Sequence, residues 1–183
     1  MSGPAPTTGV IMGTVEGSSM VPRQFFVYFG ASSAAAGALI GLLFVAVSLR
    51  SDTIFGEQAR PSGRAMAGSA FIGLANGFFV SLAALVPTTN VGSVAAGMAV
   101  ISLVSTVYLH WRLTGSETHR LMLSVSVLFY TAEFVGSLLL AVRPHDMTLV
   151  ITLAYLVMTT LLVSLVRAWR HMERPSEVRG SGT

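Results

Sequence analysis

The chain of 183 residues contains no cysteine and no lysine. Without cysteine it cannot form disulfides, thiolate metal sites, iron–sulfur clusters or c-type haem attachments. Without lysine it cannot form a Schiff base with retinal or pyridoxal phosphate, and it cannot carry a Walker A phosphate loop. These absences exclude most cofactor classes, and the sequence predicts neither a cofactor nor a bound metal ion.

Charge is also scarce, since Asp, Glu, Lys and Arg together make up 10% of the residues and apolar residues make up 52%. Soluble proteins are about a quarter charged, so most of this protein's surface is expected to face something other than water. The net charge of +3 comes from arginines spread along the chain. Because they do not cluster on a soluble module, we expect no nucleic-acid partner.

Long apolar runs account for this composition. A helix of roughly 20 apolar residues spans the hydrocarbon core of a bilayer, and five runs reach that length: 25–49, 65–86, 91–110, 121–142 and 147–166. The sequence therefore predicts an all-α bundle of five transmembrane helices within residues 25–167. Residues 1–24, rich in Gly, Pro, Ser and Thr, are expected to form a disordered tail, and residues 168–183 a basic tail.

The arginines also predict an orientation, because positively charged loops stay in the cytoplasm. Under a five-span topology only Arg23 and Arg143 fall on one side. The other nine fall on the opposite side: Arg50, Arg60, Arg64, Arg112, Arg120, Arg167, Arg170, Arg174 and Arg179. We expect a multi-pass protein of a bacterial plasma (inner) membrane with its N-terminus outside. Its Arg-rich C-terminal tail would bind anionic lipid headgroups, at about 1 kcal/mol per arginine.

Small residues repeat every fourth position in the first two runs. Gly37 and Gly41 belong to such a series in the first run, and Gly73 and Gly77 to one in the second. Small residues let two membrane helices approach closely. The pattern predicts that these two helices form the tightest contact in the bundle, although the same faces could join two copies of the chain or a membrane protein partner.

One acid, Glu133, lies in the middle of an apolar run, where an ionised carboxylate costs on the order of 3 kcal/mol on insertion scales. Tyr130 and Ser137 share its helix face. Asn76 lies near the midpoint of the second run, and Tyr155 lies in a threonine stripe of the last. Two interpretations stay open: a polar path with Glu133 as proton or cation site, or a protonated Glu133 that locks the bundle through a hydrogen bond.

The stretch GALIGLLFVAVSL at 37–49 resembles the first helix of small five-helix actinobacterial membrane proteins. Most of these are uncharacterised, and some carry the label "modulator of FtsH protease". The resemblance continues at Ile54, Arg64-Ala65, Val80-Ser81-Leu82 and Leu85-Val86-Pro87. It implies a small partner of a membrane-anchored protease, and it carries no site residues over to this chain.

These observations leave two classes of function. The first is a binding or regulatory partner that acts through helix–helix contacts, and the alternative is an oligomeric channel or transporter for protons or small cations with Glu133 in its path. An enzyme is not expected, because no nucleophile–base pair, metal constellation or phosphate loop occurs in the sequence.

Overall fold

The computed structural model describes residues 21–49, 61–111 and 117–172. After a short 3₁₀ turn (η1, Arg23–Phe25), the described residues form five α-helices: α1 (Phe26–Leu49), α3 (Pro61–Leu85), α4 (Val91–Trp111), α5 (Glu117–Val142) and α6 (Met147–Met172). Each contains a segment that is long and apolar enough to cross a membrane. The prediction of an all-α fold with five spans is confirmed, and the chain is a multi-pass membrane protein.

The helices extend beyond the apolar runs that predict them. α3 begins at Pro61, four residues before the run, and α6 continues to Met172, six residues past it. Hydropathy marks the part of a helix that lies in lipid, whereas the helix itself continues until its backbone hydrogen bonds stop. Proline fits the first helical position because the backbone N–H that it lacks would have no partner within the helix there. Most of the two predicted tails, residues 1–20 and 173–183, lies outside the described part of the chain.

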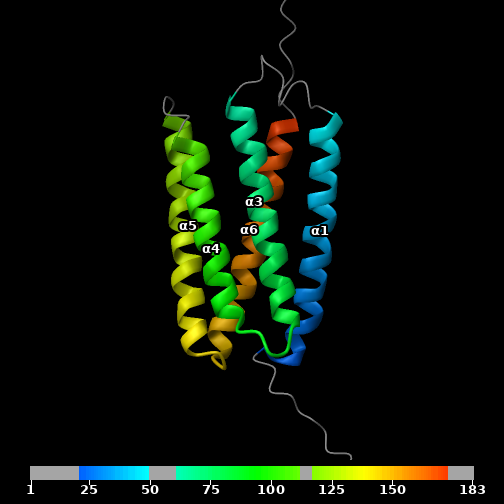
Figure 1. Cartoon of the computed structure of the whole chain (residues 1–183), viewed down its shortest axis with the longest axis vertical. Helices are drawn as coiled ribbons and strands as arrows, with labels where there is room; N and C mark the ends of the chain where they lie inside the picture. The colour runs from blue at the N-terminus through cyan, green and yellow to red at the C-terminus, as the bar shows by residue number, and fades with distance from the viewer. Residues whose placement is uncertain (1–20, 50–60, 112–116, 173–183) are drawn as a thin grey trace, which may run out of the picture.

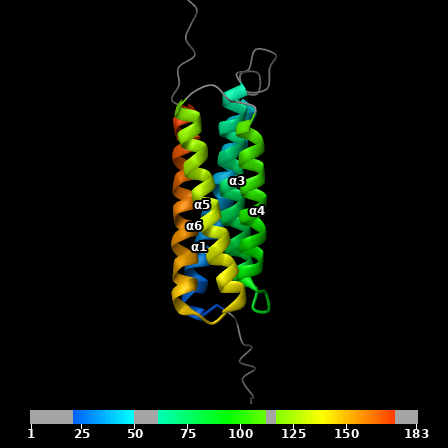
Figure 2. The same ribbon diagram turned by 90° about the vertical axis from the view of Figure 1, so that its left-hand side faces the viewer.

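Four of the helices form a ring, termed the four-helix core. Around this ring α3 contacts α4, α4 contacts α5, α5 contacts α6, and α6 returns to α3. α1 lies outside the ring and packs against α3 and α6 (Figures 1 and 2). As a result α3 and α5 face each other diagonally across the interior of the core.

Two short connections lie together at the end where α1 begins, termed the hairpin end (Figure 1). Asn90 ends the first connection: its side-chain oxygen accepts from the Ser93 N–H (3.2 Å) and its amide donates to the Ala141 carbonyl of α5 (3.1 Å). Asp146 ends the second, where its carboxylate accepts from the Thr148 N–H at 3.0 Å. Both residues cap the helix that follows. The opposite end, where α6 finishes, is termed the C-terminal end.

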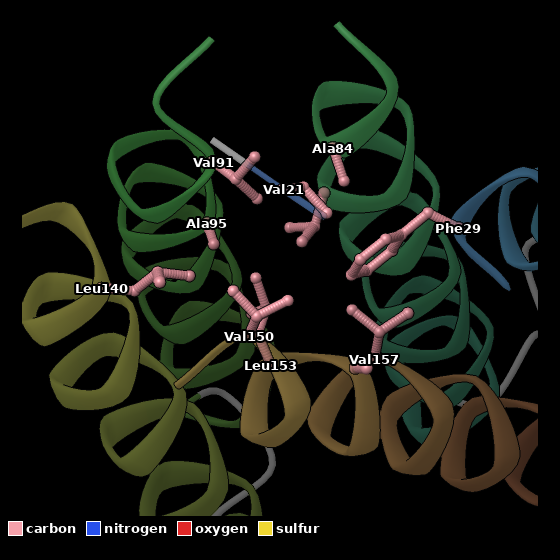
Figure 3. Packing of buried hydrophobic residues seen from close by; sticks show 11 residues of the cluster. Val21, Phe29, Ala84, Val91, Ala95, Leu140, Val150, Leu153 and Val157 are labelled. Atoms are coloured by element: carbon pink, nitrogen blue, oxygen red, sulfur yellow. The ribbon is translucent and has the colours of Figure 1, made fainter. Parts of the chain in front are cut away.

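The interior of the core is mainly apolar at the hairpin end. The apolar cluster there comprises Val21, Phe29, Val80, Ala84, Val91, Ala95, Leu140, Val150, Leu153, Ala154 and Val157. Phe29 reaches in from α1 and is fully buried, and Val21, from the segment before α1, sits among Ala84, Val91 and Val150 (Figure 3). The N-terminal segment thus helps to fill the hairpin end of the core.

The tightest helix contact is not the predicted one. A Cβ added to Gly92 of α4 would overlap the Ala141 backbone nitrogen of α5 and lie 2.7 Å from the Ser137 carbonyl oxygen. The same addition at Gly37 of α1 would meet only the Phe78 ring, at 3.5 Å, and at Gly41 it would meet nothing within 4 Å.

The reason lies in the face that α1 turns inward. Its buried residues are Phe29, Ser33 and Ala36, so the large Phe29 ring helps to set the spacing and Gly41 faces outward. The prediction of a tightest contact between the first two helices is therefore wrong. Small residues mark faces that can approach closely, and the packing of neighbouring large residues decides which of them do.

Candidate functional site

Glu133 lies in the interior of the four-helix core. Its side chain is 0% exposed, and the Asn76 side-chain amide donates to both carboxyl oxygens, at 2.8 and 2.9 Å. Since Asn76 belongs to α3 and Glu133 to α5, this pair crosses the diagonal of the core. The carboxyl group therefore faces protein and not lipid, as expected for an intramembrane acid.

The buried face of α5 is polar along most of its length. Ser126, Tyr130, Glu133 and Ser137 are all nearly inaccessible. Their spacing of three or four residues places them on one side of a helix. The prediction that Tyr130 and Ser137 share the face of Glu133 is confirmed.

Tyr130 connects α5 to the other three helices of the core. Its side chain lies beside that of Thr106 on α4. Its hydroxyl lies 3.5 Å from the position that a Cβ on Gly73 would occupy, and that Cβ would also overlap the Ser164 hydroxyl of α6. Glycine at 73 thus leaves room for two polar side chains that meet between α3, α5 and α6.

Gly73 and Gly77 therefore do not serve the contact that their spacing predicts. A Cβ on Gly77 would come within 2.7 Å of the Leu161 side chain of α6. Both glycines lie against the four-helix core and not against α1. The neighbour of both glycines is α6, whereas their spacing predicts a contact with the first helix.

Within the described part of the chain, four polar atoms of this interior have no hydrogen-bond partner: Asn76 Oδ1 and the hydroxyls of Ser81, Ser102 and Ser137. All four side chains are less than 2% exposed. Buried polar atoms in proteins are nearly always paired with protein or with water. Asn76 contacts the Glu133 carboxyl group and Ser137 follows it by one helical turn, so water or a small ligand would find hydrogen-bond partners there.

Helix register places Glu133 at the same depth as Asn76 and Ser102. Asn76 lies nine residues before the end of α3, Glu133 nine residues before the end of α5, and Ser102 eleven residues after the start of α4. At about 1.5 Å per residue, all three lie roughly 14–17 Å from the hairpin end. This is near the middle of a hydrocarbon core about 30 Å thick.

Toward the C-terminal end the polar interior finishes at a charge. Arg167 of α6 donates to the Ser126 hydroxyl of α5 at 2.6 Å. Ser126 lies two helical turns from Glu133 on the same face. The term polar column denotes the polar side chains of this interior: Asn76 of α3, Ser102 and Thr106 of α4, Ser126, Tyr130, Glu133 and Ser137 of α5, and Ser164 and Arg167 of α6.

Tyr155 does not join the polar column. Its side chain is 63% exposed, because the inward face of α6 is formed by Leu153, Val157, Thr160 and Ser164. The threonine stripe beside it also faces outward, and its hydroxyls bond back to their own helix, as Thr159 does to the Tyr155 carbonyl at 2.8 Å. Of the predicted polar residues, Glu133, Asn76, Tyr130 and Ser137 come together and Tyr155 stays apart.

Sequence reasoning missed the contributions of α4 and α6. Ser102 and Thr106, four residues apart in an otherwise apolar stretch of α4, are a signal that could have been found. Ser164 lies within the run 147–166 as a single hydroxyl among leucines and valines, and Arg167 was missed because that run ends at residue 166, so the arginine was interpreted as headgroup anchoring. The structure turns that Arg167 side chain inward instead.

The chemistry of the polar column is that of hydroxyl, amide and carboxyl groups. Hydroxyls both donate and accept hydrogen bonds, and a carboxyl group can gain or lose a proton. Among the described residues, no three His, Cys, Asp or Glu side chains gather as they would around a metal ion. The column therefore offers sites for protons, water or a monovalent ion bound by oxygen.

Comparison of the chain with protein-family models, with curated proteins and with solved structures finds no significant match. The resemblance of residues 37–49 to small actinobacterial membrane proteins therefore stays a prediction.

Proposed function

We propose that the protein moves a proton or small cation across its membrane, with Glu133 as the carrier group. One observation carries this proposal: a fully buried carboxyl group, paired across the core with Asn76, shares its interior with three hydroxyls that have no partner among the described residues. A group that served only as a lock between helices would need none of these additional polar atoms.

The two ends of the core have different tasks in this proposal. The polar column leads from Arg167 at the C-terminal end to Glu133. The apolar cluster at the hairpin end is the barrier that has to open for passage. Such a barrier fits a transporter or gated channel, in which continuous passage is blocked at rest.

Ion flux in liposomes tests the proposal. Wild-type protein is compared with Glu133→Gln, whose amide can still pair with Asn76, and with Asp146→Asn, a control acid at the hairpin end that remains a helix cap. We expect flux in wild type and Asp146→Asn and none in Glu133→Gln. Equal flux in all three, or none in wild type, would exclude Glu133 as carrier.

A second function, binding of a membrane partner, is favoured by the outer face of α1. Among the described elements α1 contacts only α3, α6 and η1, and Cβ atoms added to Gly30 or Gly41 would meet nothing within 4 Å. This face could receive a second copy or a larger membrane protein, including a protease. The test is photocrosslinking in cells from Ala38 on α1, with Val104 on the exposed face of α4 as control. Equal crosslinking from both positions would contradict a specific role for α1.

For the orientation we propose that the hairpin end lies outside, because nine of the eleven arginines fall on the other side of a five-span chain. The absence of cysteine makes this simple to test. Thr88→Cys at the hairpin end should react with an impermeant thiol reagent on intact cells, whereas Ser176→Cys in the C-terminal tail should react only after lysis. The reverse pattern would invert the topology.

A further inference from the structure

Resting on the proposed function, we infer that the cargo bound at Glu133 is a proton, and that the Asn76 amide turns over to stabilise both charge states of the carboxyl group. The pairing of these two side chains supports this inference. The amide nitrogen faces both carboxyl oxygens, while the amide oxygen is buried without a partner. Asparagine is well suited to this position because it carries a double donor and an acceptor on one rotatable group.

The pairing as it stands fits an ionised carboxylate, which accepts hydrogen bonds only. When Glu133 takes a proton from hydronium in the surrounding water, an O–H bond of the hydronium breaks, its electron pair stays on the water molecule, and a new O–H bond on one carboxyl oxygen makes that group a donor. Rotation of the Asn76 amide by half a turn then places its oxygen, which has no partner before the rotation, where it accepts from this O–H. On release the O–H bond breaks, the electron pair stays on the carboxylate, and the proton passes to water from the C-terminal end.

A metal cation fits the same site poorly. Hard cations are held by several oxygen ligands, but both carboxyl oxygens of Glu133 already accept from an N–H₂ group. The path toward the C-terminal end is also close-packed where Tyr130, Gly73 and Ser164 meet. A proton needs only one acceptor, and hydroxyls such as those of Ser137, Ser102 and Tyr130 can pass it by exchanging hydrogen bonds.

The charged and titratable groups around Glu133 are few. Among the described core residues, α5 contributes Tyr130 and α6 contributes Arg167, whose guanidinium keeps its charge throughout the physiological pH range. The described buried polar residues of α3 and α4 are all neutral: Ser69, Asn76, Ser81, Ser102 and Thr106. A change of protonation inside the described core therefore belongs to Glu133, or to Tyr130 only at strongly alkaline pH.

Infrared difference spectroscopy of the full-length protein in liposomes tests the inference, since a protonated carboxylic acid has its own carbonyl band. We expect a band whose amplitude changes reversibly with pH and which is unaffected when sodium replaces choline in the buffer. The band should be absent in Glu133→Gln, displaced in Glu133→Asp and retained in Asp146→Asn. Asn76→Leu should lose most of the pH-dependent amplitude, because leucine offers neither donor nor acceptor.

Two outcomes would overturn the inference: a band that does not change with pH, or a band that sodium removes at constant pH. The first would make Glu133 a permanent structural group, and the second would make a metal ion the cargo. A band that titrates in wild type while liposomes show no flux would reject transport and leave the proton site standing. The Glu133→Asp variant keeps the test decisive if Glu133→Gln does not fold.

Discussion

The interior of the four-helix core changes in character along its length. At the hairpin end it is filled mainly by Val, Leu, Ala and Phe side chains, beside the hydroxyls of Ser81 and Ser137, and from the middle to the C-terminal end it holds a carboxyl, an amide, hydroxyls and a guanidinium. In water the hydrophobic effect would drive the apolar side chains inward, but lipid is as apolar as leucine and supplies no such force. The apolar cluster is therefore stabilised by the fit of its surfaces, whereas the polar column is interior because lipid would penalise it.

This difference predicts what each region tolerates. Where shape is the stabilising factor, an added or removed methyl group should matter and chemical type should matter little. Where hydrogen bonding is the stabilising factor, loss of one partner should lower the free energy of unfolding more than loss of both partners. The predictions below test these expectations, from the largest effect to the smallest.

The largest effect is expected from Gly92→Ala, because the new Cβ would strike the backbone of α5 at Ala141 and Ser137, which cannot move aside as a side chain could. We expect the free energy of unfolding to fall by about 3 kcal/mol. The measurement is denaturation in mixed micelles. Gly97→Ala on the same helix is the matched control, since a Cβ there meets nothing within 4 Å and alanine favours the helix. Similar losses in both variants would show that backbone contact is not the cause.

A double-mutant cycle at Asn76 and Glu133 tests the polar side of the comparison. Asn76→Leu alone or Glu133→Leu alone leaves a buried polar group without its partner, and each should cost about 2 kcal/mol. The double variant removes both groups and should cost only about 1 kcal/mol, so that about 3 kcal/mol of the summed loss is recovered. Strict additivity in the same unfolding assay would mean that the hydrogen bonds at 2.8 and 2.9 Å do not couple the two residues.

A cavity in the apolar cluster should cost less than the same cavity in a soluble protein. Val157→Ala removes two buried methyl groups from the cluster. Because the unfolded helices remain in lipid, only the packing contribution is lost, and we expect about 1 kcal/mol. Val163→Ala, at a partly exposed position of the same helix, should leave stability unchanged. A loss above about 3 kcal/mol at Val157 would mean that a water-like solvent reaches this region on unfolding.

Hydropathy was sufficient to predict the five helices, since each span is set by the thickness of the bilayer. The pair Glu133–Asn76 was also accessible from sequence, because polar groups at the middle of apolar spans have few partners other than each other. The ring order of the helices was not accessible. It depends on how side chains such as Phe29 and Phe78 fill space, and small-residue spacing carries no record of that.

Tyr155 shows a second limit. α6 carries two sets of hydroxyl side chains, one containing Thr152 and Thr159 and the other Thr160 and Ser164. A threonine hydroxyl can satisfy itself on its own helix, so it can face lipid without a second helix. The sequence alone therefore could not tell which set turns inward, and the prediction chose the one that the structure places outside.

The smallest effect is expected from the pair Thr159→Val and Thr160→Val, which differ by one residue and by the direction they face. Both hydroxyls bond back to the helix, to the Tyr155 and Leu156 carbonyls, so each change should alter stability by less than about 0.5 kcal/mol. Proton flux in liposomes should separate them. Thr160 is buried on the inner face of α6, where its hydroxyl belongs to the polar interior, whereas Thr159 is exposed. Flux should fall in Thr160→Val and stay at the wild-type rate in Thr159→Val. The opposite result would place the path on the outer face of α6, beside Tyr155, and would remove the polar column from the transport route.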